Sequence, residues 1–136
     1  MTFDLATYLN LAEEILELDK ANDGHDNAYL RCSISRAYYS VFCIARNFKG
    51  LKHYWGPADE PFHIAVLDKY RTSGGRNKKI DKRIWQLLDY LRKLRVSADY
   101  HEEHTLTKEK VRDGVEKARE CYDKLVGTYG DDYNFS

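Results

Sequence analysis

Arg95 and His101 stand close together in the sequence and carry two side-chain types that suit chemistry on an anionic substrate. A guanidinium offers a fork of hydrogen-bond donors to phosphate oxygens. An imidazole, with an ordinary pKa of about 6.5, accepts and releases protons near neutral pH. The pair therefore indicates a site that binds phosphate and moves a proton.

The position of Arg95 breaks local rules. It continues an apolar line on its predicted helix, and that line consists of Ile84, Leu88 and Leu91. An unpaired charge in such a line is costly, so Asp99, one turn further on, is expected to pair with it. An acid near a helix C-terminus opposes the helix dipole, and local rules broken together often mark functional sites. The alternative is a structural Arg–Asp clamp that fixes the helix end.

His101 lies six residues beyond Arg95, which places it about 120° further around an ideal helix. The two side chains converge if the helix ends near Asp99, or if a second copy of the chain contributes its own pair. A twofold axis brings the same patch of two chains together. The spacing is therefore compatible with a helix that ends near Asp99 or with a homodimer that has a composite Arg/His site.

Helical periodicity dominates the elements that must position these residues. Five helices are expected, at residues 4–18, 26–49, 61–71 and 78–99, and onward from Thr107 as N-cap. Gly50 predicts the end of the second helix, which is expected to be central. Helices of this length with short loops predict an all-α, antiparallel bundle of four to five helices. We expect one domain over residues 1–126 and a frayed tail at 127–136.

Apolar stripes predict the buried face of each helix. On the first helix the stripe consists of Leu5, Tyr8, Leu11, Ala12, Ile15 and Leu18. On the fourth helix it consists of Ile80, Ile84, Leu87, Leu91, Leu94 and Ala98.

The composition is that of one soluble globular domain, because the 136 residues are 43% hydrophobic and 32% charged. No apolar run reaches membrane-spanning length and no secretion signal is visible, so the cytoplasm is the expected location. Three cysteines without a CxxC pair predict reduced thiols rather than a disulfide framework or a zinc ribbon.

The formal net charge is zero, but the charges are unevenly spread. Residues 1–26 hold seven acids and one Lys, whereas residues 69–95 hold ten Lys or Arg and two Asp. A basic face of this kind suits nucleic-acid phosphates, and a solvated helix surface is the alternative. If the face binds RNA, its rim consists of Arg76, Lys78, Lys79, Lys82 and Arg83.

Two segments have a pattern of their own, Ser33-Ile-Ser-Arg-Ala-Tyr-Tyr-Ser-Val-Phe42 and Leu91-Arg-Lys-Leu-Arg-Val-Ser-Ala-Asp-Tyr-His101. They resemble the HEPN family, small helical proteins of prokaryotic defence and toxin–antitoxin systems. The second segment is similar to the R-x3-D-Y signature of stand-alone members, and the likeness spans nearly the whole chain. Catalytic members of that family are dimeric, metal-independent ribonucleases with an Arg, four to six further residues and a His.

The resemblance implies an endoribonuclease that is a toxin or defence component, with Arg95 and His101 as the catalytic pair. It also implies a supporting set made of Asp99, Tyr100, Arg36 and Tyr39. Val96 stands where active members carry a polar residue. The alternative is therefore a non-catalytic HEPN module that binds nucleotide or docks a partner nucleotidyltransferase.

The remaining patterns predict no metal and no cofactor. His101 and His104 are three residues apart, whereas the zincin motif spaces its two His four apart. The segment 73–79 is glycine-rich and basic but lacks the GK[ST] ending of a P-loop. His63 is expected to be a structural histidine, and tyrosines at helical spacing, such as Tyr38, to be core residues with one wet end.

Overall fold

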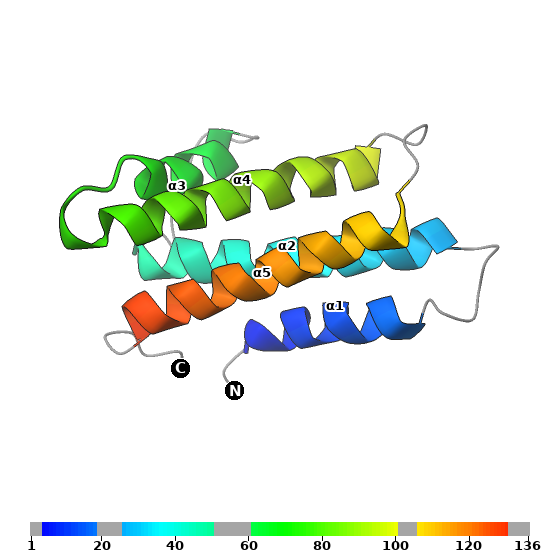
Figure 1. Ribbon diagram of the computed structural model, residues 1–136. Helices are drawn as coiled ribbons and strands as arrows, with labels where there is room; N and C mark the ends of the chain where they lie inside the picture. Colours follow the sequence, from blue (N-terminus) through cyan, green and yellow to red (C-terminus); the bar gives the residue numbers. More distant parts are fainter. Residues whose placement is uncertain (1–3, 19–25, 51–60, 101–105, 131–136) are drawn as a thin grey trace.

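The computed structural model describes residues 4–18, 26–50, 61–100 and 106–130, and of residues 18, 26–27, 61 and 98–100 it describes the backbone only. The helices are α1 (Ala6–Leu18), α2 (Asp26–Phe48), α3 (Pro61–Arg71), α4 (Lys78–Tyr100) and α5 (Lys108–Tyr129), with a 3-10 turn η2 (Gly75–Asn77) before α4. In Figure 1, α1 and α4 run in one direction and α2 and α5 in the other, while the short α3 lies beside α4. The predicted all-α helical bundle is confirmed.

The central helix is α2, which contacts α1, α4 and α5. Two of its serines fasten α1: Ser33 Oγ donates to the carbonyl oxygen of Ala12 at 2.8 Å, and Ser40 Oγ donates to that of Leu5 at 2.7 Å. Both serines are fully buried, and a buried hydroxyl without a partner costs about 1–3 kcal/mol. These two serines therefore hold the first pair of helices in register.

Local signals set several helix ends as predicted. The side chain of Thr107 caps α5 by accepting a hydrogen bond from the backbone N–H of Lys110 at 3.2 Å. Gly50 follows the end of α2 with a φ of 73°, a left-handed conformation that glycine adopts without steric cost. The predicted cap and stop signal are confirmed.

The buried faces of α1 and α4 differ from the predicted stripes. On α1 the buried residues are Leu9, Ala12 and Leu16. Leu11 is instead 40% exposed, and on α4 Ile80 is 41% exposed while the neighbouring Asp81 is fully buried. The prediction that Ile80 belongs to the core is wrong, because the first turn of α4 directs Asp81 inward to Lys49 and Tyr129.

Asp81 is the centre of a polar network at the end of the bundle that holds the start of α4. Its Oδ1 accepts from the Tyr129 hydroxyl at 2.5 Å and its Oδ2 from Lys49 Nζ at 3.3 Å. A buried carboxylate requires such partners, since an uncompensated charge is strongly destabilising. Tyr129 is the last residue of α5, which extends three residues into the segment 127–136 that was expected to be a frayed tail.

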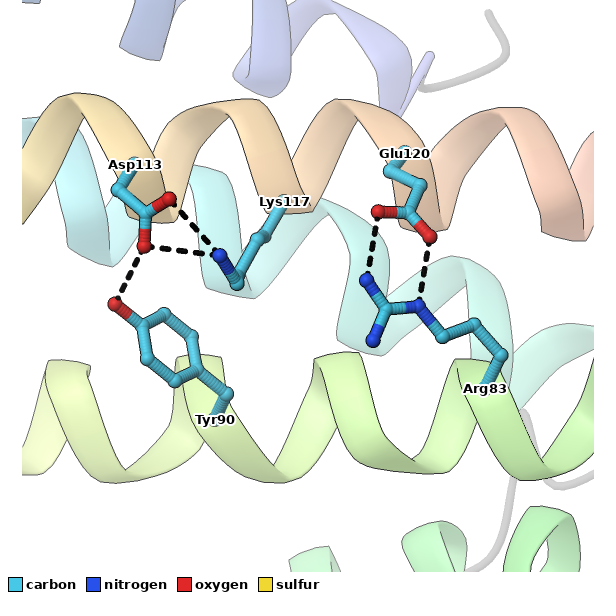
Figure 2. A network of polar contacts seen from close by, with 5 residues as sticks. All are labelled: Arg83, Tyr90, Asp113, Lys117 and Glu120. Carbon is cyan, nitrogen blue, oxygen red and sulfur yellow. Dashed lines mark hydrogen bonds and ion pairs between the residues drawn. The ribbon is translucent and has the colours of Figure 1, made fainter.

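The contact between α4 and α5 is polar at its surface (Figure 2). Arg83 makes a bidentate ion pair with Glu120: its Nε donates to Oε2 at 2.8 Å and its Nη2 to Oε1 at 3.0 Å. Asp113 accepts from the Tyr90 hydroxyl at 2.9 Å and from Lys117 Nζ at 2.9 Å. These groups are partly exposed, so they fix the register of the two helices more than they add stability.

Gly114 lets α5 approach the core closely. A Cβ added there would lie 2.7 Å from Leu94 Cδ2 and 2.8 Å from Ile34 Cδ1. Side chains of α2 and α4 therefore pack against the backbone of α5 at this position and leave no room for a larger residue.

We expect Gly114→Val to lower the free energy of unfolding by about 2 kcal/mol, because overpacking a core typically costs ~1–3 kcal/mol. Gly127→Ala is the matched control in the same helix, since nothing lies within 4 Å of its added Cβ. It is expected to leave stability unchanged or raise it by up to about 1 kcal/mol. Chemical denaturation measures both changes, and equal effects would contradict the close approach at Gly114.

Candidate functional site

A cavity of about 410 Å³ lies among α2, α3 and α4. This volume falls within the range of about 300–1,000 Å³ that is usual for small-molecule sites. Its charged and aromatic lining includes Arg36, Tyr39, Arg46, Phe62, His63 and Arg95. Three separate helices thus contribute side chains to one cavity.

Arg95 reaches the cavity from α4. Ile84, Leu88 and Leu91 are all fully buried, as the apolar line predicts, and Arg95 comes next, half-buried, at the end of that line. Its guanidinium carbon lies 5.8 Å from the centre of the Tyr38 ring on α2. Within about 6 Å the face of an aromatic ring attracts a cation, so Tyr38 supports the charge where the core ends.

Tyr38 contacts both Arg95 and His63 at the base of the cavity. The residue is 1% exposed, and burial raises the pKa of its hydroxyl well above the ordinary value, although the nearby Arg92 and Arg95 oppose the shift. The hydroxyl therefore stays protonated at neutral pH. It lies 2.8 Å from Nδ1 of His63.

His63 enters from the first turn of α3. Its ring stacks on Phe42, with centroids 4.2 Å apart and planes at 21°. The ring of Phe62 packs against it in a T-shaped arrangement, with centroids 6.0 Å apart. Stacking and the bond to Tyr38 fix both the plane and the rotation of the imidazole. His63 is a satisfied histidine, as predicted, but it also lines the cavity with Arg95.

Besides Ser35, the remaining polar lining comes from one stripe of α2, which steps by three, four and three residues through Arg36, Tyr39, Cys43 and Arg46. The guanidinium of Arg36 lies 5.5 Å from the centre of the Tyr8 ring. Both Nε and Nη2 of Arg46 donate to Oδ1 of Asn47 at 3.1 Å. Both arginines are thus held by neutral groups.

The described lining of the cavity is rich in positive charge. Three arginines line it, and no acidic residue is among the described residues that do so. Tyr39 is 50% exposed, so solvent and a ligand can reach the mouth. Burial raises the pKa of the Cys43 thiol above its ordinary value, so this cysteine does not act as a thiolate nucleophile at neutral pH. The arrangement suits an anion with an aromatic or apolar part.

The structure places the predicted site residues in two groups. Arg36, Tyr39 and Arg95 line the same cavity. Of Asp99 and Tyr100 only the backbone is described, at the end of α4, and His101 lies outside the described residues.

The predicted RNA-binding rim lies elsewhere. Arg76 is in η2, and Lys78, Lys79, Lys82 and Arg83 follow in the first turns of α4. From Lys78 to Arg95 is about 25 Å along the helix at ~1.5 Å per residue. None of the five lines the cavity, and Arg83 is already engaged by Glu120. The two basic regions are therefore distinct.

Sequence reasoning missed Arg46, Phe62 and the position of His63. The signal for Arg46 was available, because Arg36, Tyr39 and Arg46 share one side of a helix at a spacing of three and seven residues. No periodicity signal exists for Phe62 and His63, since their place depends on how the short α3 packs on the bundle.

No protein-family model, no curated protein and no solved structure matches this chain. Within residues 4–18, 26–50, 61–100 and 106–130, no group of three or more His, Cys, Asp or Glu is placed to hold a metal ion. No helix in those ranges is long and apolar enough to cross a membrane.

We expect Tyr38→Phe to lower the free energy of unfolding by about 1 kcal/mol, because His63 loses a partly buried hydrogen bond. Tyr39→Phe is the control on the same helix, since the residue is half exposed and its change should stay within about 0.5 kcal/mol. Urea denaturation of the two variants measures the difference. A Tyr38→Phe protein as stable as wild type would show that the hydrogen bond does not form.

Proposed function

We propose that this protein binds RNA through the α2–α3–α4 cavity and cleaves it without a metal ion, as an endoribonuclease of the HEPN type. The observation that carries the proposal is the convergence of Arg36, Arg46 and Arg95 on one cavity. Arginine forks match phosphate oxygens in pairs. Three of them around one hollow favour a ligand with more than one negative oxygen.

The aromatic lining supports a nucleic-acid ligand over a simple anion. Tyr39 and Phe62 stand at the cavity together with the arginines, and unpaired bases stack on aromatic side chains with about 1–3 kcal/mol per base. Single-stranded RNA presents such bases, whereas bases of a duplex stay stacked on one another. The proposed substrate is therefore single-stranded RNA.

The proposed chemistry uses the 2′-hydroxyl of the RNA as nucleophile. The 2′-oxygen attacks phosphorus, the bond to the 5′-oxygen breaks, and the products are a 2′,3′-cyclic phosphate and a 5′-hydroxyl. Arg95 stabilises the negative charge on the phosphate oxygens, and His101 moves a proton. We further propose that Asp99 orients Arg95 and that two chains form a homodimer in which both motifs face one groove.

The proposed setting is the cytoplasm, as a toxin or defence component restrained by a partner such as a nucleotidyltransferase. It rests on the resemblance of the segments around Arg36 and Arg95 to HEPN proteins. The basic residues at the start of α4 would then guide the RNA strand towards the cavity.

A second candidate is a non-catalytic module that binds a nucleotide. The observation that favours it is the volume of the cavity, about 410 Å³, which falls within the range usual for small-molecule sites. Such a module would hold a nucleotide and leave RNA intact.

We expect the purified protein to cleave single-stranded RNA in EDTA and to leave cyclic phosphate ends. Arg95→Ala should lower the cleavage rate at least about 100-fold, because loss of one donor to a developing oxyanion typically costs 10²–10³. His101→Ala should have an effect of similar size. Gel analysis of end-labelled RNA measures both.

Arg112→Ala is the matched control, because Arg112 is exposed on α5 and does not line the cavity. Its cleavage rate should equal that of wild type, and circular dichroism should be the same for every variant. Wild-type protein that is inert on varied RNAs would remove the ribonuclease proposal. Retained nucleotide binding in that protein would favour the module instead.

A further inference from the structure

We infer that Arg46 is a second phosphate-binding residue of the cavity, so that the ligand is an RNA strand of at least two nucleotides that runs along α2. The inference rests on the proposed function and deepens it, because it names the length of RNA that the cavity selects. Arg46 and Arg95 line the same cavity from different helices, Arg46 from α2 and Arg95 from α4.

The two guanidinium groups belong to different levels of the cavity. Arg95 lies over the ring of Tyr38. Arg46 follows Tyr38 on α2 by eight residues, which is about 12 Å along the axis at ~1.5 Å per residue. Two phosphate groups of one strand suit this separation, whereas a mononucleotide carries its phosphate in one place.

The guanidinium of Arg46 is held by a neutral neighbour. Its Nε and Nη2 both donate to Oδ1 of Asn47 at 3.1 Å, and the residue is half-buried. A guanidinium has five N–H donors, and these two bonds engage neither donor of Nη1. Because an amide oxygen carries no charge, Arg46 remains suited to a charge-assisted bond with a phosphate oxygen.

Tyr39 lies between the two levels, on the same stripe of α2 as Arg46 and two helical turns before it. Its ring packs against Tyr8 in a T-shaped contact, with centroids 5.3 Å apart, and the residue is 50% exposed. The contact fixes the plane of the ring, and the exposed part can stack on an unpaired base. A strand presents phosphate, base and phosphate in this alternation.

The first test compares ligands of different length, and competition fluorescence anisotropy measures their affinities. The ligands are 2′-O-methyluridine 5′-phosphate and the uncleavable 2′-O-methyl tetranucleotide with the same 5′-phosphate. Wild type should bind the tetranucleotide at least about tenfold more tightly, since one hydrogen bond to a charged group contributes roughly this factor. Arg46→Gln can still donate to Asn47 but carries no charge, so it should lose most of this preference and keep its mononucleotide affinity within about twofold.

The second test separates a phosphate contact from a structural role of Arg46. The logarithm of the binding constant falls with the logarithm of the salt concentration by ~0.7 for each phosphate contact of a single strand. Arg46→Gln should therefore lower this slope by about 0.7 for the tetranucleotide, whereas Arg46→Lys, which keeps the charge, should restore it. Arg112→Gln is the matched control, because Arg112 is exposed on α5 and does not line the cavity. It should leave both affinity and slope unchanged.

The third test examines the base position. Tyr39→Leu should weaken tetranucleotide binding by about tenfold, because it removes the stacking surface. Its salt slope should equal that of wild type, since stacking involves no charge. Tyr39→Phe, which keeps the ring, should recover most of the lost affinity, and circular dichroism should be the same for every variant.

The outcomes separate the inference from the ribonuclease proposal. Wild type that binds the mononucleotide as tightly as the tetranucleotide overturns the inference, and so does an Arg46→Gln protein with wild-type affinity and slope. RNA cleavage by wild type then decides the ribonuclease proposal independently. Length-dependent binding through Arg46 in a protein that cleaves no RNA supports the inference and removes the ribonuclease proposal. Wild type that binds neither ligand overturns the inference.

Discussion

The site depends on one constraint: a guanidinium continues the apolar line of α4 at the point where the core ends. Three fully buried residues precede Arg95 on that line, so its side chain leaves the helix towards α2 and α3 rather than towards bulk water. The face of Tyr38 supports the charge at 5.8 Å. Because Tyr38 also binds His63, the position of the arginine and that of the imidazole are set by the same buried ring. All three side chains line the cavity.

Two polar regions of the bundle differ in composition and in exposure to solvent. Around Asp81, Lys49 and Tyr129 supply hydrogen bonds and a counter-charge within the core, which is the pattern of a structural network with its charge balanced. Around Arg95 the described lining holds three arginines, several aromatic rings and no acid. Positive charge beside a partly open cavity adds little to the stability of the fold, whereas it attracts an anionic ligand. This contrast is why the second region, and not the first, is the candidate site.

Much of the fold follows from the sequence because its signals are local. Thr107 and Gly50 set helix ends through hydrogen bonds and backbone conformation within a few residues, and the periodic line through Leu91 needs only the pitch of a helix. Asp81 illustrates the limit: its burial depends on Lys49 and Tyr129, which lie 32 and 48 residues away in the chain. The same holds for the site. The residue type at position 95 indicated phosphate chemistry and a family resemblance implied Arg36 and Tyr39, whereas the place of His63 in the cavity emerges only once α3 is packed.

The guanidinium resonances of Arg36, Arg46 and Arg95 report most directly on an anionic ligand bound among these three residues. In protein labelled with ¹⁵N-arginine, a 2′-O-methyl oligonucleotide should shift the Nε–Hε signals of these three residues in a saturable way, while the signal of Arg112 stays in place. Shifts confined to Arg76 and Arg83 at the start of α4, with the three cavity signals unchanged, would contradict the account.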